Sequence, residues 1–372
     1  MARIRDWIDL GKQTVQSFDR REVKELYSLE WPEAKRRLIA DHADAIEQEP
    51  KKFRKCALTF SALLFGLARR LSPSRRMVFA GALILAILAI LHFLFASGEW
   101  TNDSASTLQL ALAFVAMTLL LGFELVDKLK FRDELELARD LQANLIPKHL
   151  TAPPGYELAA YNRIANTVGG DIYDFVPLSE GRLAVLFGDA SGHGMAAGLV
   201  MAVAHATFRT QLDADSSPSA VTSALNRILC RTGGTRSFFS GAYVRLSSDG
   251  SFTATLAGHP PLCLVNAEGA IARKFGKGSY PLGIKPSIEW ETESGRLEPG
   301  ESLLFYSDGL PEARNERGEE FGDDILASLL VEMKGRGPQS TIDRIVASLA
   351  AFNGRLPPED DVSIAVITRR RD

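Results

Sequence analysis

The sequence has little cysteine and no cysteine pairing motif. Its three cysteines, Cys56, Cys230 and Cys263, lie far apart, and no CxxC pair is present. A disulfide framework or a zinc knuckle is therefore not expected, and a reducing compartment fits best. The six histidines form no cluster, which further argues against a zinc site.

The sequence also lacks an excess of charge, internal repeats and a secretory leader. Lys and Arg number 43, Asp and Glu number 46, and the formal net charge is −3. This balance gives no general case for nucleic-acid binding, and none is expected. No short apolar stretch follows a basic start, so a cleavable signal peptide is not expected. The 46% hydrophobic content is enough for a sizeable core.

Long apolar runs are concentrated between residues 77 and 127. The run 77–96 has no Asp, Glu, Lys or Arg, and about 20 residues at 1.5 Å each reach the roughly 30 Å of a bilayer core. A second run covers 107–123. We therefore predict two transmembrane helices within 77–127, with a buried soluble hairpin as the alternative. Basic residues flank both outer ends and only acids lie in the link, which predicts that both long termini are cytoplasmic.

Two further regions adjoin this hairpin. Residues 1–76 are predicted to be an N-terminal cytoplasmic helical region, and residues 128–150 a linker helix. Side chains at 4-3-4-3 spacing in the linker fit either a short coiled coil or a helix packed on the next domain: Phe131, Leu135, Ala138, Gln142 and Leu145. Pro147 ends this helix because proline cannot continue it.

The remaining residues, 151–372, have the pattern of one α+β domain. Seven β-prone runs are separated mainly by short turns, which indicates antiparallel meanders: 158–161, 183–187, 239–246, 252–257, 262–265, 302–306 and 362–368. Four helical patterns would cover the sheets: 195–212, 218–231, 323–334 and 340–352. The expected fold is a layered β-sandwich flanked by helices.

Carboxylates recur beside glycine at strand ends in this domain. Asp189 follows an apolar run and is the second residue of GDASGHG, Asp171 lies in the acidic turn GGDIYD, and Asp308 lies in SDG. Asp360 and Asp361 precede the last β-prone run. One such residue is commonly a solvated turn, but four such sites in one domain favour a centre for a hard cation such as Mg²⁺ or Mn²⁺. Glycine allows the backbone to approach a ligand closely.

These motifs carry a family resemblance. The stretch from about residue 134 to 368 resembles the SpoIIE-type phosphatases, a bacterial branch of the metal-dependent PPM protein serine/threonine phosphatases. The matching segments occur in the expected order: ELELARDLQANLIP, VGGDIYDF, FGDASGHGMAAGLVMA, AGHPPL, YPLGI, LLFYSDGLPEARN and DDVSIAV. Ala190 stands where the family usually has Val, and Ser307 and Ser363 stand where Thr is common. These departures are conservative.

The resemblance implies two Mn²⁺ or Mg²⁺ ions at one edge of the sandwich. Asp189 would bridge both ions, and the Ala190 carbonyl would complete one site. Asp171 and Asp308 would hold metal or its water shell, and Asp189 and Asp171 would be the catalytic residues. Asp360 is favoured over Asp361 as the last ligand. A water activated by the ions would attack phosphorus in line, without a covalent phosphoenzyme.

The resemblance also implies a substrate class and a cellular setting. The substrate would be phosphoserine or phosphothreonine on an anti-anti-sigma (STAS-domain) protein in partner-switching signalling. The chain would form a homodimer through the linker helix. Together with the two apolar runs and their flanking basic residues, the bacterial family predicts a multi-pass protein of the cytoplasmic membrane with a cytoplasmic catalytic domain. The alternatives are a membrane-anchored phosphoprotein-binding module without turnover and, because GGD is similar to a GGDEF loop, a nucleotidyl cyclase.

Other candidate groups are weaker. His193 and His259 are possible proton donors to the leaving alkoxide, but a structural role in their turns is favoured. The Ser191 hydroxyl has no base assignable from sequence. Cys230 and Cys263 lack an HCxxxxxR-like setting, which disfavours a cysteine-based phosphatase.

Overall fold

A computed structural model describes residues 35, 38–40, 43–95, 104–147, 149–192, 194–232, 237–276 and 278–371. The chain divides into two compact units, Met1–Lys130 and Phe131–Asp372. The amphipathic pattern expected near the N-terminus, residues 97–103 of the polar link and His193 lie outside the described residues.

The first unit is helical. It contains α4 (Ala43–Gln48), α5 (Lys52–Arg70), α6 (Pro73–Phe95) and the start of α7 (Ser104–Ala143). The α6 and α7 helices are long and apolar enough to cross a membrane, and only 17% and 6% of their apolar stretches are buried, unlike a core helix. Arg75 near the start of α6 forms ion pairs with Glu124 (2.8 Å) and Asp127 (2.7 Å) of α7.

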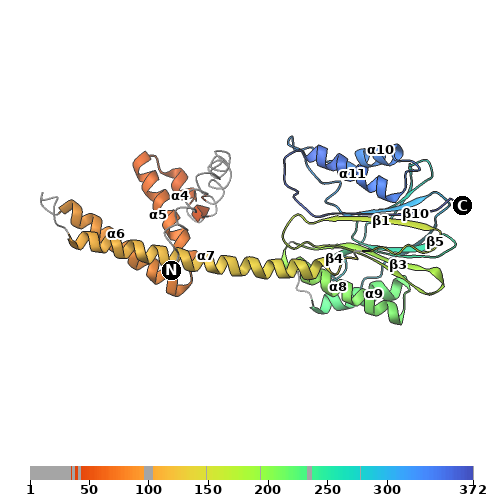
Figure 1. The fold of residues 1–372 in the computed structure, drawn as a ribbon, viewed down its shortest axis with the longest axis horizontal. Helices are drawn as coiled ribbons and strands as arrows, with labels where there is room; N and C mark the ends of the chain where they lie inside the picture. The colour runs from red at the N-terminus through yellow and green to blue at the C-terminus, as the bar shows by residue number, and fades with distance from the viewer. Residues whose placement is uncertain are drawn as a thin grey trace, which may run out of the picture. The chain divides into compact units, whose positions relative to one another are not determined.

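The second unit contains two five-stranded antiparallel sheets (Figure 1). One sheet has the strand order β1-β10-β9-β6-β7, and the other has the order β2-β3-β4-β5-β8. Their bounds are β1 Tyr156–Arg163, β2 Asp171–Pro177, β3 Leu183–Ala190, β4 Phe239–Leu246, β5 Ser251–Ala257, β6 Leu262–Val265, β7 Ile271–Phe275, β8 Thr292–Arg296, β9 Ser302–Tyr306 and β10 Val362–Arg369.

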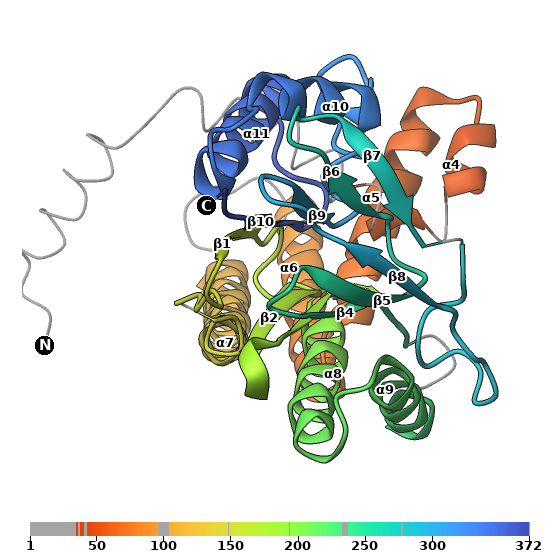
Figure 2. The same cartoon turned by 90° about the vertical axis from the view of Figure 1, so that its right-hand side faces the viewer.

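Helices cover both outer faces of the two sheets (Figure 2). The α8 (Met195–Ala214) and α9 (Pro218–Thr232) helices pack on the β2–β3–β4 side, and α10 (Gly322–Glu332) and α11 (Pro338–Asn353) pack on the β1–β10–β9 side. A short 3₁₀ turn, Ser179–Gly181, joins β2 to β3. The predicted layered α+β sandwich flanked by helices is confirmed.

Strand alternation divides the core into three layers. Val185 and Phe187 of β3 point between the sheets, whereas Leu186 points toward α8 and α9. Because β3 is buried on both faces, its sequence is a continuous apolar run rather than an alternating one.

All seven predicted strands and all four predicted helices of this unit are present, with small shifts at their ends. Three strands were not predicted: β2, β7 and β8. The expectation of an acidic turn at residues 169–174 is wrong in part, because Asp171 begins β2 and Asp174 lies inside it, fully buried.

Candidate metal centre

The pairing of β2 with β3 brings two predicted site residues together. Asp171 is directly opposite Asp189 in the antiparallel register. Asp171 shares a strand face with Tyr173 and Phe175, and Asp189 shares one with Phe187, so both carboxylates lie on the face between the sheets. Both therefore lie at one end of the sandwich interior.

The second sheet contributes to the same end. Ser307 follows β9 and Ser363 lies in β10. The Ser307 N–H donates to the Ser363 carbonyl (3.0 Å), and the Ser363 N–H donates to the Ser307 hydroxyl (2.9 Å). Hydrogen bonds from both serines to Asp171 oppose the rise in the pKa of that carboxyl. The two serines therefore join the sheets at the carboxylates.

The electrostatics indicate that the predicted carboxylates lie near one another at this end. Burial raises the pKa of Asp189 to about 9, and four neighbouring carboxylates add to the rise: Asp171, Asp308, Asp360 and Asp361. We refer to these five residues as the acid cluster. Burial likewise raises the pKa of Asp171 to about 7, and the charges of Asp361 and Asp308 contribute. Such pKa values indicate negative charge concentrated in a poorly solvated place.

A bound cation would offset the cost of burying these negative charges. Asp171 is only 2% exposed, and its Oδ2 atom has no hydrogen-bond partner. An unpaired buried carboxylate oxygen is costly unless a metal or a proton satisfies it. Among the residues that the structure describes, no three His, Cys, Asp or Glu side chains form a ready-made cage for one ion. Mg²⁺ and similar ions can bind with only one or two carboxylate ligands, because water molecules complete their coordination.

Asp360 and Asp361 have different surroundings. The Asp361 carboxylate accepts hydrogen bonds from the backbone N–H groups of Ala165 and Gly170, both at 2.7 Å, and is buried. Asp360 is exposed, and its Oδ1 accepts the N–H of Asp361 at 2.8 Å. Asp361 therefore holds the Gly170 backbone, whereas Asp360 is the member of the cluster that faces solvent.

Gly170 is required by the closeness of the backbone to the carboxylates. A Cβ atom at this position would lie 2.3 Å from Asp189 Oδ1 and 2.6 Å from the Ala190 carbonyl oxygen. The Gly170 carbonyl also accepts the Ala190 N–H at 3.1 Å. Only glycine leaves room for this approach, which brings the Ala190 carbonyl next to the cluster.

His259 is unsuited to act as the proton donor. Its Nδ1 lies 2.9 Å from the Pro260 carbonyl, which can only accept, so the ring proton is on Nδ1. Burial lowers the pKa of His259 to about 4, so the ring is neutral near pH 7. Its ring meets Phe187 edge-on at 5.4 Å. The structural role favoured from the sequence fits these contacts. The Ser191 hydroxyl accepts the N–H of Phe238 at 2.8 Å, also a structural contact.

Gln142 is a residue whose role the sequence did not reveal. It was expected in the apolar stripe of the linker helix, but it is buried and hydrogen-bonded twice to Gly169. Its Nε2 donates to the Gly169 carbonyl at 2.7 Å, and its Oε1 accepts the Gly169 N–H at 3.0 Å. The end of α7 thereby holds the backbone next to Gly170. A polar residue inside an apolar stripe was the available signal.

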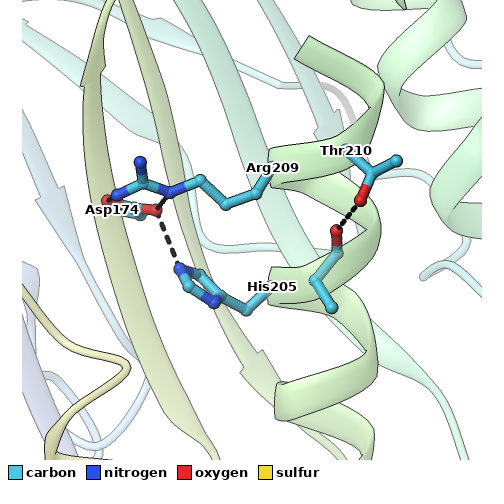
Figure 3. Close-up of polar contacts among 5 residues, drawn as sticks. Asp174, His205, Arg209 and Thr210 are labelled. Atoms are coloured by element: carbon cyan, nitrogen blue, oxygen red, sulfur yellow. Dashed lines mark hydrogen bonds and ion pairs between the residues drawn. The ribbon is translucent and has the colours of Figure 1, made fainter. Parts of the chain in front are cut away.

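An ion pair on the buried carboxylate of Asp174 fixes α8 on the sheet (Figure 3). Asp174 of β2 contacts His205 (2.8 Å) and the NH2 group of Arg209 (2.8 Å), which lie one helical turn apart on α8. Burial alone would raise the pKa of Asp174, but hydrogen bonds from His205 and Arg209 outweigh it and hold the pKa below its usual value. The α8 helix starts just after the GDASGHG segment, so this clamp fixes an element that adjoins the acid cluster.

Two antiparallel sheets with outer helices, and carboxylates from both sheets meeting at one end, define a PP2C-type (PPM) phosphatase domain. The family model for stage II sporulation protein E (SpoIIE) matches residues 179–370, which is more than half of the chain. The chain belongs to the SpoIIE family. This fold does not support the nucleotidyl cyclase alternative.

Individual relatives agree with this assignment. Protein IcfG of Synechocystis is 26% identical over 227 residues, covering 54% of this chain and 36% of that protein. Phosphoserine phosphatase RsbU of Bacillus subtilis is 24% identical over 242 residues, covering 65% of this chain and 71% of that protein. The SiaA-PP2C domain of Pseudomonas aeruginosa superposes with a TM-score of 0.58 at 20% identity, covering 66% of this chain and 99% of that domain, and shows the shared fold. The chain thus spans about a third of IcfG.

Proposed function

We propose that this chain is a metal-dependent protein phosphatase that hydrolyses phosphoserine or phosphothreonine on a regulatory protein. The observation that carries the proposal is the Asp171–Asp189 pair, buried, directly opposed and raised in pKa by burial and neighbouring acids. Bound cations would satisfy such a pair, and cations held beside a phosphate ester promote its hydrolysis. The similarity to RsbU, which is named a phosphoserine phosphatase, supports the same activity.

In this proposal each residue has a defined task. Asp189, Asp171, Asp308, Asp360 and the Ala190 carbonyl hold two Mn²⁺ or Mg²⁺ ions. When bound, the ions supply Lewis acidity and lower the pKa of water. Ser307 and Ser363 orient the Asp171 carboxylate, and Asp361 holds the Gly170 backbone. Asp360 is preferred to Asp361 as a ligand because both Asp361 oxygens already accept backbone hydrogen bonds.

The substrate that we propose is a phosphorylated anti-anti-sigma protein with a STAS domain, acting in a partner-switching pathway. The support is the family membership and the similarity to RsbU. We also propose that residues 77–127 anchor the chain in the bacterial cytoplasmic membrane as two spanning helices, with residues 1–76 and the phosphatase domain (151–372) in the cytoplasm. The exposed apolar surfaces of α6 and α7 support this.

The linker, residues 128–150, is proposed to mediate a homodimer. Gln142 of the predicted stripe is buried and Leu135 is half-buried, so this face packs on the phosphatase domain. Leu137 and Leu141, one turn apart, are 61% and 63% exposed. We therefore place the dimer contact on Leu137 and Leu141 rather than on Leu135. Sedimentation of a Leu141→Glu variant tests this: an unchanged dimer would contradict it.

The test of the proposed function uses the full-length chain in lipid nanodiscs with a phosphoserine STAS protein. Phosphate release should require Mn²⁺ or Mg²⁺, stop with EDTA, and be lost in Asp189→Asn. Asp249→Asn is the matched control, because Asp249, like Asp189, adjoins a glycine near a strand end but lies in the exposed turn after β4. In the β3–β4 register that turn is at the opposite end of the strands from Asp189. A chain that binds the phosphoprotein without releasing phosphate would favour the binding-module alternative.

A further inference from the structure

The α5 helix carries an apolar surface that the described part of the chain leaves uncovered. Four exposed side chains recur at helical spacing on one of its faces, and we refer to them as the α5 stripe: Phe53, Cys56, Phe60 and Leu67. Phe53 is 87% exposed and Phe60 is 63% exposed. Another face of α5 packs within the first unit, because Ala62 is only 2% exposed and Gly66 lies close to the backbone of Leu38.

The charge around the α5 stripe is of one sign. From residue 50 to residue 98 the chain has eight Lys and Arg residues and no Asp or Glu. Lys52, Arg54 and Lys55 are exposed in the first turn of α5, and among the described residues their side chains form no ion pair. The last turn of α5 is also basic. Aromatic and aliphatic side chains surrounded by positive charge alone fit a partner that is both apolar and negatively charged.

The α5 helix directly adjoins α6, the first of the two helices that are long and apolar enough to cross a membrane. Only Leu71 and Ser72 lie between them, and the candidate span of α6 is Pro73–Leu91. Arg76 of α6 donates hydrogen bonds to the carbonyl of Ala68 at 3.0 Å and to the carbonyl of Leu71 at 3.3 Å. These bonds tie the end of α5 to the start of α6. If α6 spans the bilayer, the C-terminal end of α5 therefore lies at the membrane surface.

A helix at this place can cross the bilayer or lie on it. Between its basic ends α5 has only the apolar run 56–68, which is too short to cross a hydrocarbon core and is typical of an interfacial helix. Resting on the membrane anchoring proposed above, we propose that α5 lies in the plane of the cytoplasmic leaflet and binds anionic phospholipids. The α5 stripe enters the boundary of the acyl chains, and the basic side chains bind the phosphate groups. The chain then has a second membrane attachment, which is selective for anionic lipid.

The experiment places the full-length chain in nanodiscs of phosphatidylcholine, with or without phosphatidylglycerol, and attaches a bimane label to Cys56. Cys230→Ser removes the half-buried cysteine, and Cys263 is buried. Doxyl groups on the lipid acyl chains quench a label that enters the bilayer, and fluorescence lifetimes give the ratio of quenched to unquenched label. We expect this ratio to be higher with phosphatidylglycerol, and to fall at high salt because salt screens exposed charges.

Neutralising the basic side chains of α5 tests the choice of lipid. Lys52→Gln, Arg54→Gln and Lys55→Gln together should lower the ratio in phosphatidylglycerol about a hundredfold, since each basic residue at an anionic surface contributes about fivefold. The matched control replaces by glutamine three exposed basic residues of the phosphatase domain: Lys334, Arg336 and Arg355. This control removes the same charge and should keep the ratio of the unaltered chain.

Extraction of membranes with alkaline carbonate measures the anchoring separately. A chain that resists extraction but whose Cys56 label is quenched in neither lipid would overturn the proposal, leave the anchoring intact, and place a protein partner on the α5 stripe. Equal ratios with and without phosphatidylglycerol, or an unchanged ratio in the triple variant, would also overturn the proposal, because the binding would then not depend on anionic lipid. A chain that carbonate extracts would refute the anchoring and the proposal together.

Discussion

Replacing Gln142 by leucine should weaken both the fold and the metal centre. Leucine fills similar space but removes both hydrogen bonds to Gly169, whose N–H and carbonyl are buried. An unpaired buried backbone group costs about 1–3 kcal/mol, so the loss is about 2–4 kcal/mol after some relaxation. For a unit of this size that corresponds to a fall in unfolding midpoint of about 5–15 °C.

The same substitution should raise the metal requirement. Gly169 precedes Gly170, whose N–H binds Asp361 and whose carbonyl binds the Ala190 N–H. A displaced turn therefore moves backbone that contacts the acid cluster. If the free energy of Mn²⁺ binding becomes about 1.4 kcal/mol less favourable, the Mn²⁺ concentration that gives half-maximal activity will rise about tenfold.

The assay is phosphatase activity against Mn²⁺ concentration, together with thermal unfolding, on full-length chain. Arg139→Gln serves as control, because Arg139 is exposed on the same helix. An unchanged Mn²⁺ titration with a lowered midpoint would refute the link between α7 and the metal centre. No change in either measurement would refute the importance of both hydrogen bonds.

Three further predictions follow from the site. The folded-state pKa of Asp189, about 9, lies above its ordinary value, so the free energy of unfolding of the metal-free chain should fall as pH rises from about 4 to about 9. In EDTA, the plot of unfolding free energy against pH should be flatter for Asp189→Asn than for the unaltered chain. Equal slopes for the two chains would contradict this prediction. Gly170→Ala should abolish phosphatase activity, because the added methyl group would clash with Asp189 and Ala190. Gly122→Ala is the control and should keep activity, because its methyl group would contact no atom. An active Gly170→Ala variant would show that the backbone can move to make room. Asp174→Asn should lower stability by about 1–3 kcal/mol, because Arg209 is half-exposed and can regain water; an unchanged unfolding midpoint would mean that the clamp adds nothing.

The sequence predicted the elements that local patterns determine. The apolar run before Asp189 identified β3, because a strand buried on both faces needs apolar residues throughout. Glycine beside aspartate, repeated in several motifs, correctly indicated carboxylates that the fold brings together. The family motifs supplied the order of those residues, and the fold agrees with them.

What the sequence did not predict depends on partners far along the chain. Asp174 is a charged residue in a buried strand, which is stable only because Arg209 and His205 arrive from α8. The segment TESGR of β8 has no apolar alternation, because it lies at a sheet edge and is largely exposed. The role of Gln142 depends on Gly169, 27 residues away. Long-range hydrogen bonds and ion pairs of this kind leave no local periodicity.

The position of β10 has a consequence for how this domain folds during synthesis. Of the ten strands of the two sheets, β10 comes after all the others in sequence, yet it lies in the interior of its sheet, between β1 and β9. Asp360 and Asp361 immediately precede it. A nascent chain that has emerged only as far as β9 therefore lacks both the strand that joins β1 to the sheet and two members of the acid cluster. A chain that ends before Asp360 therefore cannot complete this sheet or the acid cluster.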